Sequence, residues 1–287
     1  MRLYALRHGQ SEVNSKNIFG GWIDVHLTEK GLKQAKNSAV LIKEHCEKNG
    51  LELPKVGYTS RLVRTEETMR EILKEFGKDP EFHIVSGPEP PKVEHLDNGK
   101  FEVYQSWRLN ERHYGSWQGQ SKHKMMEEVG AEQYMYIRRD YFGKPPQADL
   151  TKEMVQNFDQ GDTGYEFKEP NRHEKYLQEE LSHDDLPNGE SLYDVVQRVN
   201  PLLEKLILPN LKKFGDGIIV GHGSTVRSLL KILEGVSDSD IKDVNIPNAI
   251  PLVIELDEDF KFVRKYYLDP ESAKVNAELV RKEGLKE

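Results

Sequence analysis

Two histidine-centred tripeptides hold most of the chemical information in this chain. Arg7-His8-Gly9 follows the first apolar run of the sequence, and Gly221-His222-Gly223 follows a much later one at 218–220. Open α/β sheets hold their ligands where strand ends open into loops. A neutral imidazole placed there can attack phosphorus, and a second imidazole can help to bind phosphoryl oxygens. The two tripeptides therefore indicate phosphoryl transfer.

The neighbours of His8 suit a phosphate pocket. Arg7 has the planar fork of donors that binds non-bridging oxygens, and Gly9 permits close backbone approach. Ser11 and Asn14 can donate further hydrogen bonds. An Arg-His-Gly tripeptide alone is more often a polar surface loop. The apolar run before it and the Ser-x-x-Asn after it favour a binding site.

Three further groups of charged residues have two interpretations each. They are Arg64 near the start of a predicted helix, Glu111 followed by Arg112, and the pair Arg138-Arg139 with Lys122 upstream. Each can be solvated surface charge that contributes little to stability. In a partly dry pocket, Glu111 would instead donate a proton to a leaving oxygen, and the cations would suit an acid that carries phosphate and carboxylate. The residues alone leave both interpretations open.

Several other function classes fit poorly. The chain has 10 His and 1 Cys but no His-Glu-x-x-His, and therefore no metal-ligand spacing. It also has no nucleophile elbow, Walker loop or dinucleotide fingerprint. The net charge of −8 argues weakly against a nucleic-acid binder. No apolar stretch approaches the roughly 20 residues that span a bilayer, and the lone Cys46 cannot form an internal disulfide. A cytoplasmic protein without a membrane partner fits these features.

Strands and helices must position these groups, and their predicted order is that of an α/β sheet. Short apolar runs predict strands at 3–6, 56–59, 218–220, 252–256 and 262–267. Helical periodicity predicts a helix from Thr28 to Asn49 with the stripe Leu32, Ala35, Ala39, Ile42 and Cys46. Further helices are predicted after residue 60, after a capping box at Ser191 and Asp194, over 225–234 and after Asp269. Pro201 is expected to kink the helix that begins after Ser191.

Two irregular stretches interrupt this order. Residues 78–105 are rich in Pro and Gly, and Asn98-Gly99 predicts a hairpin. Residues 143–190 are polar and contain many Pro, Gly and Asp residues. Because no shift in composition marks a boundary, we expect one domain over 1–287 with insertions near 78–105 and 145–188 and a C-terminal tail at 270–287.

The motifs taken in chain order resemble a known family. They are RHGQSEVN, FGGWIDVHLTEKG, YTSRLVRT, WRLNERHYGSWQG, IRRDY, GHGSTVRSLLKILEG and IPNAIPLVIELD. This set resembles the cofactor-dependent phosphoglycerate mutases of the histidine phosphatase superfamily, from Arg2 to about Gly284. RHG alone is a superfamily signal, whereas LNERHYG followed by the Arg-Arg pair is typical of the mutases. The resemblance implies a three-layer α/β sandwich with a mostly parallel mixed sheet flanked by helices.

The resemblance also implies a role for each matching residue. His8 would be the phosphorylated nucleophile and Glu111 the general acid and base, with Arg7, Arg64 and His222 completing the phosphate pocket. The implied substrate contacts come from Ser11, Asn14, Gly20, Gly21, Arg112, His113, Tyr114, Lys122, Arg138, Arg139, Gly223 and Ser224. Gly20 stands where the family has a hydroxyl residue, and Ser224 stands where it usually has Asn.

The implied reaction interconverts 3-phosphoglycerate and 2-phosphoglycerate. In the family, 2,3-bisphosphoglycerate primes the enzyme, no metal is needed, and the C-terminal tail helps to close the site. His8 must then be neutral when it attacks, and Glu111 protonated when it donates. The partners would be small phosphorylated three-carbon acids, with no nucleic acid, and the protein would form a dimer or a tetramer. The alternatives are bisphosphoglycerate mutase or phosphatase activity, or a weakly active paralogue with a binding or regulatory role, since the insertions resemble those of divergent fungal paralogues.

Overall fold

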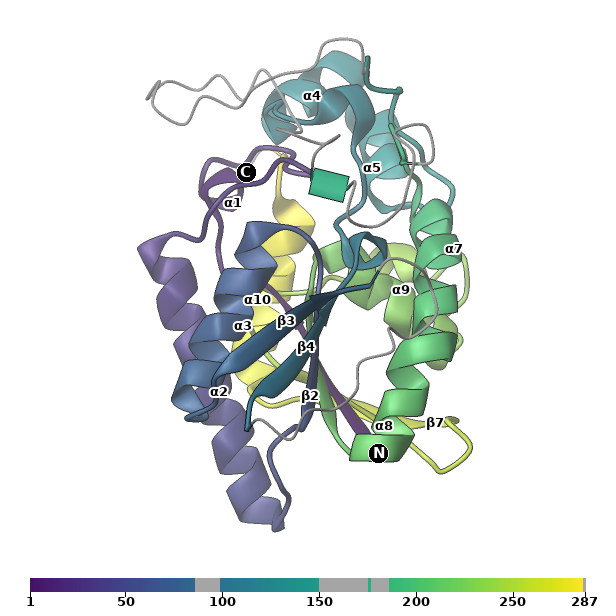
Figure 1. The fold of residues 1–287 in the computed structure, drawn as a ribbon. Helices are drawn as coiled ribbons and strands as arrows, with labels where there is room; N and C mark the ends of the chain where they lie inside the picture. Colours follow the sequence, from purple (N-terminus) through teal and green to yellow (C-terminus); the bar gives the residue numbers. More distant parts are fainter. Residues whose placement is uncertain (86–98, 150–174, 177–185, 286–287) are drawn as a thin grey trace.

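A mixed sheet lies at the centre of the chain (Figure 1). The structure is a computed structural model, and it describes residues 1–85, 99–149, 175–176 and 186–285. Within these residues the sheet has 7 strands in the order β3-β4-β2-β5-β1-β6-β7. Neighbours from β3 to β1 pair in parallel, whereas β6 pairs antiparallel with β1 and β7 antiparallel with β6. The predicted mostly parallel sheet is therefore confirmed.

The central strands are apolar because both of their faces are covered. Every residue of β5 is buried, and so are all residues of β1 except Arg2. The strands are β1 (Arg2–Arg7), β2 (Val56–Thr59), β3 (Pro80–Ile84), β4 (Phe101–Gln105), β5 (Gly217–Gly221), β6 (Leu252–Leu256) and β7 (Phe262–Tyr267).

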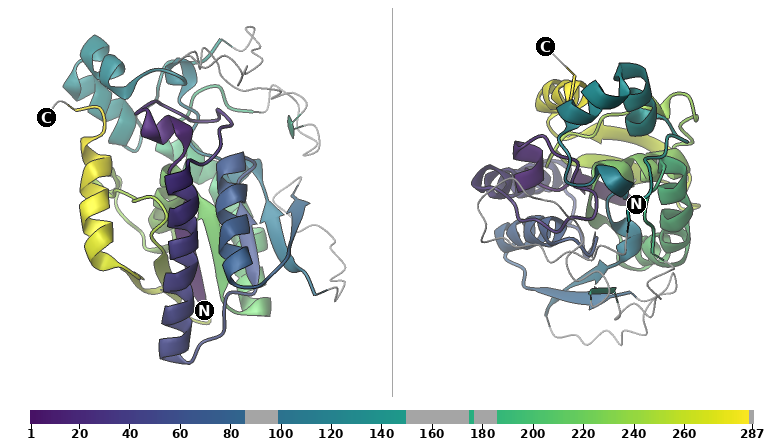
Figure 2. Two further views of the ribbon diagram at one scale, coloured as in Figure 1. Left: turned by 90° about the vertical axis from the view of Figure 1, so that its left-hand side faces the viewer. Right: turned by 90° about the horizontal axis from the view of Figure 1, so that it is seen from above.

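Helices pack on both faces of the sheet and form the two outer layers (Figures 1 and 2). One layer contains α2 (Glu29–Asn49), α3 (Val63–Glu75) and α10 (Pro270–Lys282), and the other contains α7 (Leu192–Leu202), α8 (Leu208–Phe214) and α9 (Gly223–Leu233). Tyr4 and Leu6 of β1 belong to the core under α2 and α3, whereas Leu3 and Ala5 belong to the opposite core. This alternation confirms the three-layer sandwich.

Short elements cap the carboxyl edge of the parallel strands. These are α1 (Glu12–Ser15), α4 (Lys122–Val129), α5 (Ala131–Arg139) and the 3₁₀ turns Trp107–Leu109, Gly115–Trp117 and Ile241–Asp243. Phe19, Trp117, Met125, Tyr134 and Ile137 form a separate apolar cluster there. Among the described residues, no helix combines the length and the apolar character that a membrane crossing requires.

The helix boundaries follow the expected capping residues. The Thr28 side chain accepts a hydrogen bond from the Gly31 amide at 3.1 Å, and Gly50 ends α2 with a φ of 63°. The capping box of Ser191 and Asp194 starts α7 as predicted. Pro201 lies inside α7, and a π-helical segment, Leu203–Ile207, follows directly. A proline removes one helical hydrogen bond, which makes it easier for the following turns to adopt the wider π-helical geometry.

The hairpin predicted at Asn98-Gly99 does not connect the two strands on either side of it. The stretch 78–105 contains β3 and β4, and these strands pair in parallel with Pro80 opposite Phe101. Parallel neighbours cannot be joined by a two-residue turn. The Pro- and Gly-rich signals belong mainly to the connection at 86–98, which lies outside the described residues together with Asn98 itself.

Two helix predictions also need correction. Leu32 was expected on the buried stripe of α2, yet it is 38% exposed, because Gly31 is the residue that faces the loop after β1. The helix predicted over 225–234 begins earlier, at Gly223, with His222 as its N-cap. Most of the insertion expected at 145–188 lies outside the described residues.

The contact between Gly9 and Gly31 gives a first prediction. A Cβ on Gly31 would lie 2.1 Å from the Gln10 carbonyl oxygen, and a Cβ on Gly9 would lie 2.3 Å from the Gly31 carbonyl oxygen. We expect Gly31→Ala to lower the free energy of unfolding by about 1–3 kcal/mol, since backbone atoms must move apart. Urea unfolding measures this change.

Gly189→Ala is the matched control for this variant. Its Cβ would meet no heavy atom closer than 3.5 Å. A Gly31→Ala protein as stable as the control would show that the two backbones are not packed as the structure describes.

Candidate active site

A single pocket gathers most of the residues that the sequence singled out. It opens at the carboxyl ends of β1 and β5, under α4, α5 and the end of α10. The predicted site residues that line it are Arg7, His8, Asn14, Gly20, Gly21, Arg64, Glu111, Arg112, Tyr114, Lys122, Arg138, Arg139, Gly223 and Ser224. These residues come from distant parts of the chain, and the sheet order brings them together.

His8 is held as a neutral imidazole with a defined tautomer. Its Nδ1 lies 2.6 Å from the Gly9 carbonyl oxygen, which can only accept, so Nδ1 must donate. The unprotonated Nε2 then accepts from Arg64 Nε at 3.3 Å. Burial lowers the pKa of His8 well below its usual value, and the charges of Arg64 and Arg7 lower it further. This is the protonation state that a nucleophilic histidine needs.

His222 lies directly beside His8 but is not among the residues that line the pocket. The two ring centroids are 5.0 Å apart, and His222 Nε2 lies 2.8 Å from Ser60 Oγ. Burial, and then the charge of Arg64, lower the pKa of His222 well below its usual value. His222 Nδ1 is buried and has no hydrogen-bond partner among the described residues.

The pocket arginines are fixed by backbone carbonyl oxygens. Arg64 donates to Ile23 and Gly21, both at 2.7 Å, and Arg139 donates to Lys242 at 3.0 Å and Val244 at 2.6 Å. Arg112 donates to Ile137 at 2.9 Å. Carbonyl oxygens carry only partial charge, so these contacts orient the guanidinium groups without cancelling their positive charge. The pocket wall therefore remains electropositive.

The end of α10 closes one side of the pocket with a carboxylate. Glu283 pairs with Lys122 at 2.5 Å and with Arg138 at 2.9 Å, and its backbone oxygen accepts from the Tyr134 hydroxyl at 3.0 Å. Burial opposes the ionisation of Glu283, but the charges of Lys122 and Arg138 outweigh it and lower its pKa to about 2. Two cations expected to bind substrate thus hold the C-terminal segment in this structure.

Two other predicted contacts lie outside the lining of the pocket. Ser11 is the N-cap of α1, and its hydroxyl donates to Asn14 Oδ1 at 3.0 Å. The His113 ring is fully buried against Trp22, and its Nδ1 lies 3.0 Å from the Gly115 amide nitrogen. Ser11 therefore supports Asn14, which does line the pocket, whereas His113 packs behind it.

Several pocket residues were missed by sequence reasoning. Val280, Glu283, Ile246 and Arg227 line the pocket, and Trp22 donates its indole N–H to the Glu111 carbonyl oxygen at 2.7 Å. Asp269-Pro270 and Gly284 located the last helix, but no local signal marked Glu283 as the residue facing the site. Arg227 sits on α9 one turn after Gly223, a spacing that could have placed it on the same face.

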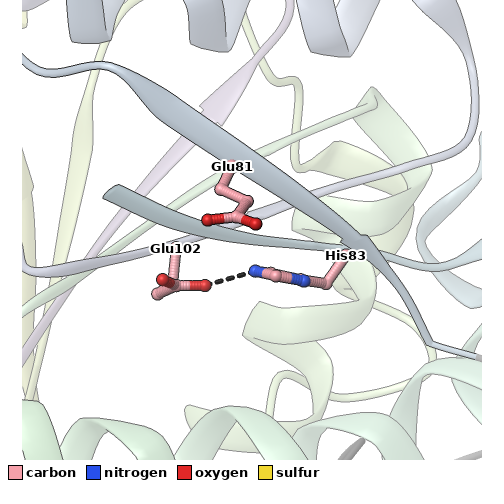
Figure 3. Close-up of side chains that lie close together, drawn as sticks. All are labelled: Glu81, His83 and Glu102. Carbon is pink, nitrogen blue, oxygen red and sulfur yellow. Dashed lines mark hydrogen bonds and ion pairs between the residues drawn. The ribbon is translucent and has the colours of Figure 1, made fainter. Parts of the chain in front are cut away.

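A second cluster of chemical interest lies at the far edge of the sheet (Figure 3). Glu81 and His83 project from β3 and Glu102 from β4, with ligand atoms within 4.8 Å of one another, and His83 is paired with Glu102. Strand spacing puts β3 about 19 Å from β1 across four steps of about 4.8 Å. None of the three residues lines the pocket described above.

Comparison with known proteins defines the family. Residues 3–84 and 159–269 match the histidine phosphatase superfamily (branch 1). Phosphoglycerate mutase 3 of Saccharomyces cerevisiae is 58% identical over 99% of this chain and 96% of its own length. A 2,3-bisphosphoglycerate-dependent phosphoglycerate mutase of Bifidobacterium longum is 38% identical over 99% of both chains.

The solved structures agree with this at the level of the fold. A mycobacterial glucosyl-3-phosphoglycerate phosphatase aligns with a TM-score of 0.59 at 20% identity, covering 93% of this chain and 97% of its own. The chain belongs to the histidine phosphatase superfamily and, within it, to the phosphoglycerate mutases. The family resemblance drawn from the sequence motifs is confirmed.

The protonation states of His8 and His222 give a second prediction. We expect His8 and His222 to remain neutral from pH 8 to pH 6, because burial and the nearby arginines lower both pKa values. Long-range ¹H–¹⁵N spectra of the imidazoles would show His8 protonated at Nδ1 and unprotonated at Nε2 throughout.

His26 serves as an internal control. Its hydrogen bond to Glu67 raises its pKa above the usual value, so at pH 6 it should carry both protons. A His8 that titrates together with His26 would contradict the described environment of the pocket.

Proposed function

We propose that this protein is a 2,3-bisphosphoglycerate-dependent phosphoglycerate mutase that interconverts 3-phosphoglycerate and 2-phosphoglycerate through a phosphohistidine at His8. The observation that carries the proposal is the neutral His8, whose unprotonated Nε2 lies in an electropositive pocket. The names of the 58% and 38% identical relatives support the enzyme class. They do not favour the phosphatase, bisphosphoglycerate mutase or weakly active alternatives.

The first step phosphorylates the enzyme. The lone pair of His8 Nε2 attacks one phosphorus of 2,3-bisphosphoglycerate, and the bond from that phosphorus to the glycerate oxygen breaks. Glu111 gives a proton to the leaving oxygen, so the products are phosphohistidine and a monophosphoglycerate. Arg7 and Arg64 line the pocket beside His8, where they suit the charge of the transferred oxygens.

In the second step the phosphohistidine transfers its phosphoryl group to the free hydroxyl of a bound 3-phosphoglycerate, which forms 2,3-bisphosphoglycerate. That bisphosphate then turns over and gives its other phosphate to His8 by the first step, which leaves 2-phosphoglycerate. Ionised Glu111 takes the proton of the attacking hydroxyl, the new P–O bond forms, and the bond from phosphorus to Nε2 breaks. Lys122, Arg138 and Arg139 hold the carboxylate and the second phosphate during this exchange. Because both hydroxyls must reach one nucleophile, the bisphosphate has to turn over inside the pocket. The cationic side chains that line the pocket on several sides can bind the phosphates and carboxylate of the bisphosphate in both orientations.

The remaining parts of the proposal concern metal and assembly. Neither step needs a metal ion, and a cation held by Glu81, His83 and Glu102 would not reach the phosphates. The family resemblance further leads us to propose one domain over 1–287, a dimer or a tetramer, a cytoplasmic location, and no nucleic-acid or membrane partner. Light scattering of the purified protein tests the assembly.

Formation of the phosphoenzyme is the third prediction. Incubation with 2,3-bisphosphoglycerate and a chelator should place acid-labile phosphate on the wild-type protein, and mutase turnover should require the same primer. His8→Asn should abolish both the labelling and the turnover, because an amide side chain cannot replace the imidazole as a nucleophile. Phosphate analysis by phosphohistidine-specific mass spectrometry measures the label.

His26→Asn is the control, because this surface histidine lies outside the pocket. A wild-type protein without label, or a His8→Asn protein that is still labelled, would remove the basis of the proposed function.

The side-chain carboxylate of Glu283 gives a fourth prediction. Glu283→Gln keeps the size of the side chain but weakens its pairing with Lys122 and Arg138. We expect phosphate release to rise relative to isomerisation, because a looser closure admits water to the phosphohistidine. Both rates are measured on one preparation.

Glu278→Gln is the matched control, since Glu278 lies on α10, shortly before its C-cap Glu283, and pairs with Arg281 at the surface. If Glu283→Gln and Glu278→Gln gave the same ratio of hydrolysis to isomerisation, Glu283 would have no part in excluding water.

A further inference from the structure

Ser224 directs its side chain toward Glu111. Its hydroxyl donates to Glu111 Oε1, and its backbone N–H donates to the same oxygen at 3.3 Å. The Arg112 amide lies 2.8 Å from Glu111 Oε1 and 2.9 Å from Ser224 Oγ. The sequence suggested a substrate contact for Ser224, whereas in the structure its hydroxyl is engaged by the predicted acid.

These contacts distinguish the two oxygens of one carboxyl group. Among the described residues, the hydrogen bonds to the Glu111 side chain all end on Oε1, and Glu111 lines the pocket. An oxygen that already accepts several donors is a poor place for a proton. The acid form of Glu111 therefore carries its proton on Oε2.

We propose that Ser224 is a positioning residue for Glu111, which fixes Oε1 so that Oε2 exchanges the proton with the substrate oxygen. This inference rests on the proposed function of Glu111 as general acid and base. In the forward step the Oε2–H bond breaks as the leaving oxygen gains the proton, and in the return step Oε2 takes a proton from the attacking hydroxyl.

Other residues hold the backbone of Glu111, so the Ser224 contact acts on its side chain. The Glu111 carbonyl oxygen accepts from Trp22 at 2.7 Å and from Arg198 at 3.0 Å, so the backbone is held without Ser224. What remains to be fixed is the long side chain, which has several rotatable bonds. Ser224 is itself fixed, because it lies in the first turn of α9, where backbone N–H groups still need acceptors.

Burial makes the contact effective. Ser224 is 6% exposed and Glu111 is 9% exposed, so water has little access to the hydrogen bonds between them. In place of the usual Asn of the family, the shorter serine side chain here reaches the acid through its hydroxyl.

The test compares two phosphate donors with Ser224→Ala. With 2,3-bisphosphoglycerate the leaving alkoxide needs a proton, and we expect His8 phosphorylation to slow by about 10-fold or more with little change in KM. With 4-nitrophenyl phosphate the leaving phenolate needs no proton, so the rate of the first-turnover burst of nitrophenol, before any dephosphorylation, should match wild type. Ser224→Thr, which keeps the hydroxyl, should restore much of the lost rate.

Ser228→Ala is the matched control. Ser228 lies on the same helix, is fully buried, and its hydroxyl has no hydrogen-bond partner among the described residues. We expect this variant to behave as wild type with both donors, so that loss of a buried serine hydroxyl is separated from loss of the Glu111 contact.

The outcomes separate this inference from the proposed function. If the wild-type protein forms no phosphohistidine, the proposed function itself is wrong. With a normal wild-type protein, an equal loss on both donors, or no loss on 2,3-bisphosphoglycerate, overturns the positioning role alone. Should Ser224→Ala fail to fold, Ser224→Cys tests the same point. Its weaker donor should slow only the reaction with 2,3-bisphosphoglycerate, and an unchanged rate would overturn the role.

Discussion

The parallel pairing of β1 with β5 is the constraint on which the site depends. Arg7 lies opposite Gly221 in that register, so the residues that follow each strand, His8 and His222, emerge side by side. A shift by one residue would turn alternate side chains to the opposite face. The apolar side chains of both strands hold the register from two sides, because each face packs against its own layer of helices. The core therefore determines the distance between the two imidazoles.

The second determining feature is the concentration of buried positive charge around the pocket. Burial lowers the pKa of Arg64 and of Arg139 to about 10, yet both groups remain charged at neutral pH. Their contacts with backbone carbonyl oxygens make this burial tolerable. The resulting field disfavours a proton on His8 and favours a highly charged anion beside it. One electrostatic arrangement thus keeps His8 neutral and makes the pocket suitable for an anion.

Sequence reasoning singled out residues that the structure brings together in one pocket, because the candidate residues are concentrated in short motifs at strand ends. Arg7, His8 and Glu111 all line that pocket, and the central strands could be predicted from apolar runs. Strands β3 and β4 were missed because the Pro- and Gly-rich connection between them hid their alternation. Glu283 and the contact of Ser224 with Glu111 depend on which distant elements meet in space. Contacts between distant elements leave no periodic pattern in the local sequence, so they could not be predicted from it.

The close approach of Gly9 and Gly31 has a consequence for how this chain can vary. The loop after β1 and the start of α2 touch through backbone atoms, with no side chain between them to absorb a change. Substitution at either glycine must therefore be answered by a displacement of the other segment, and the loop segment includes His8, the residue next to Gly9. The start of a helix thus limits where the His8 imidazole can lie, and it does so through contacts between backbone atoms.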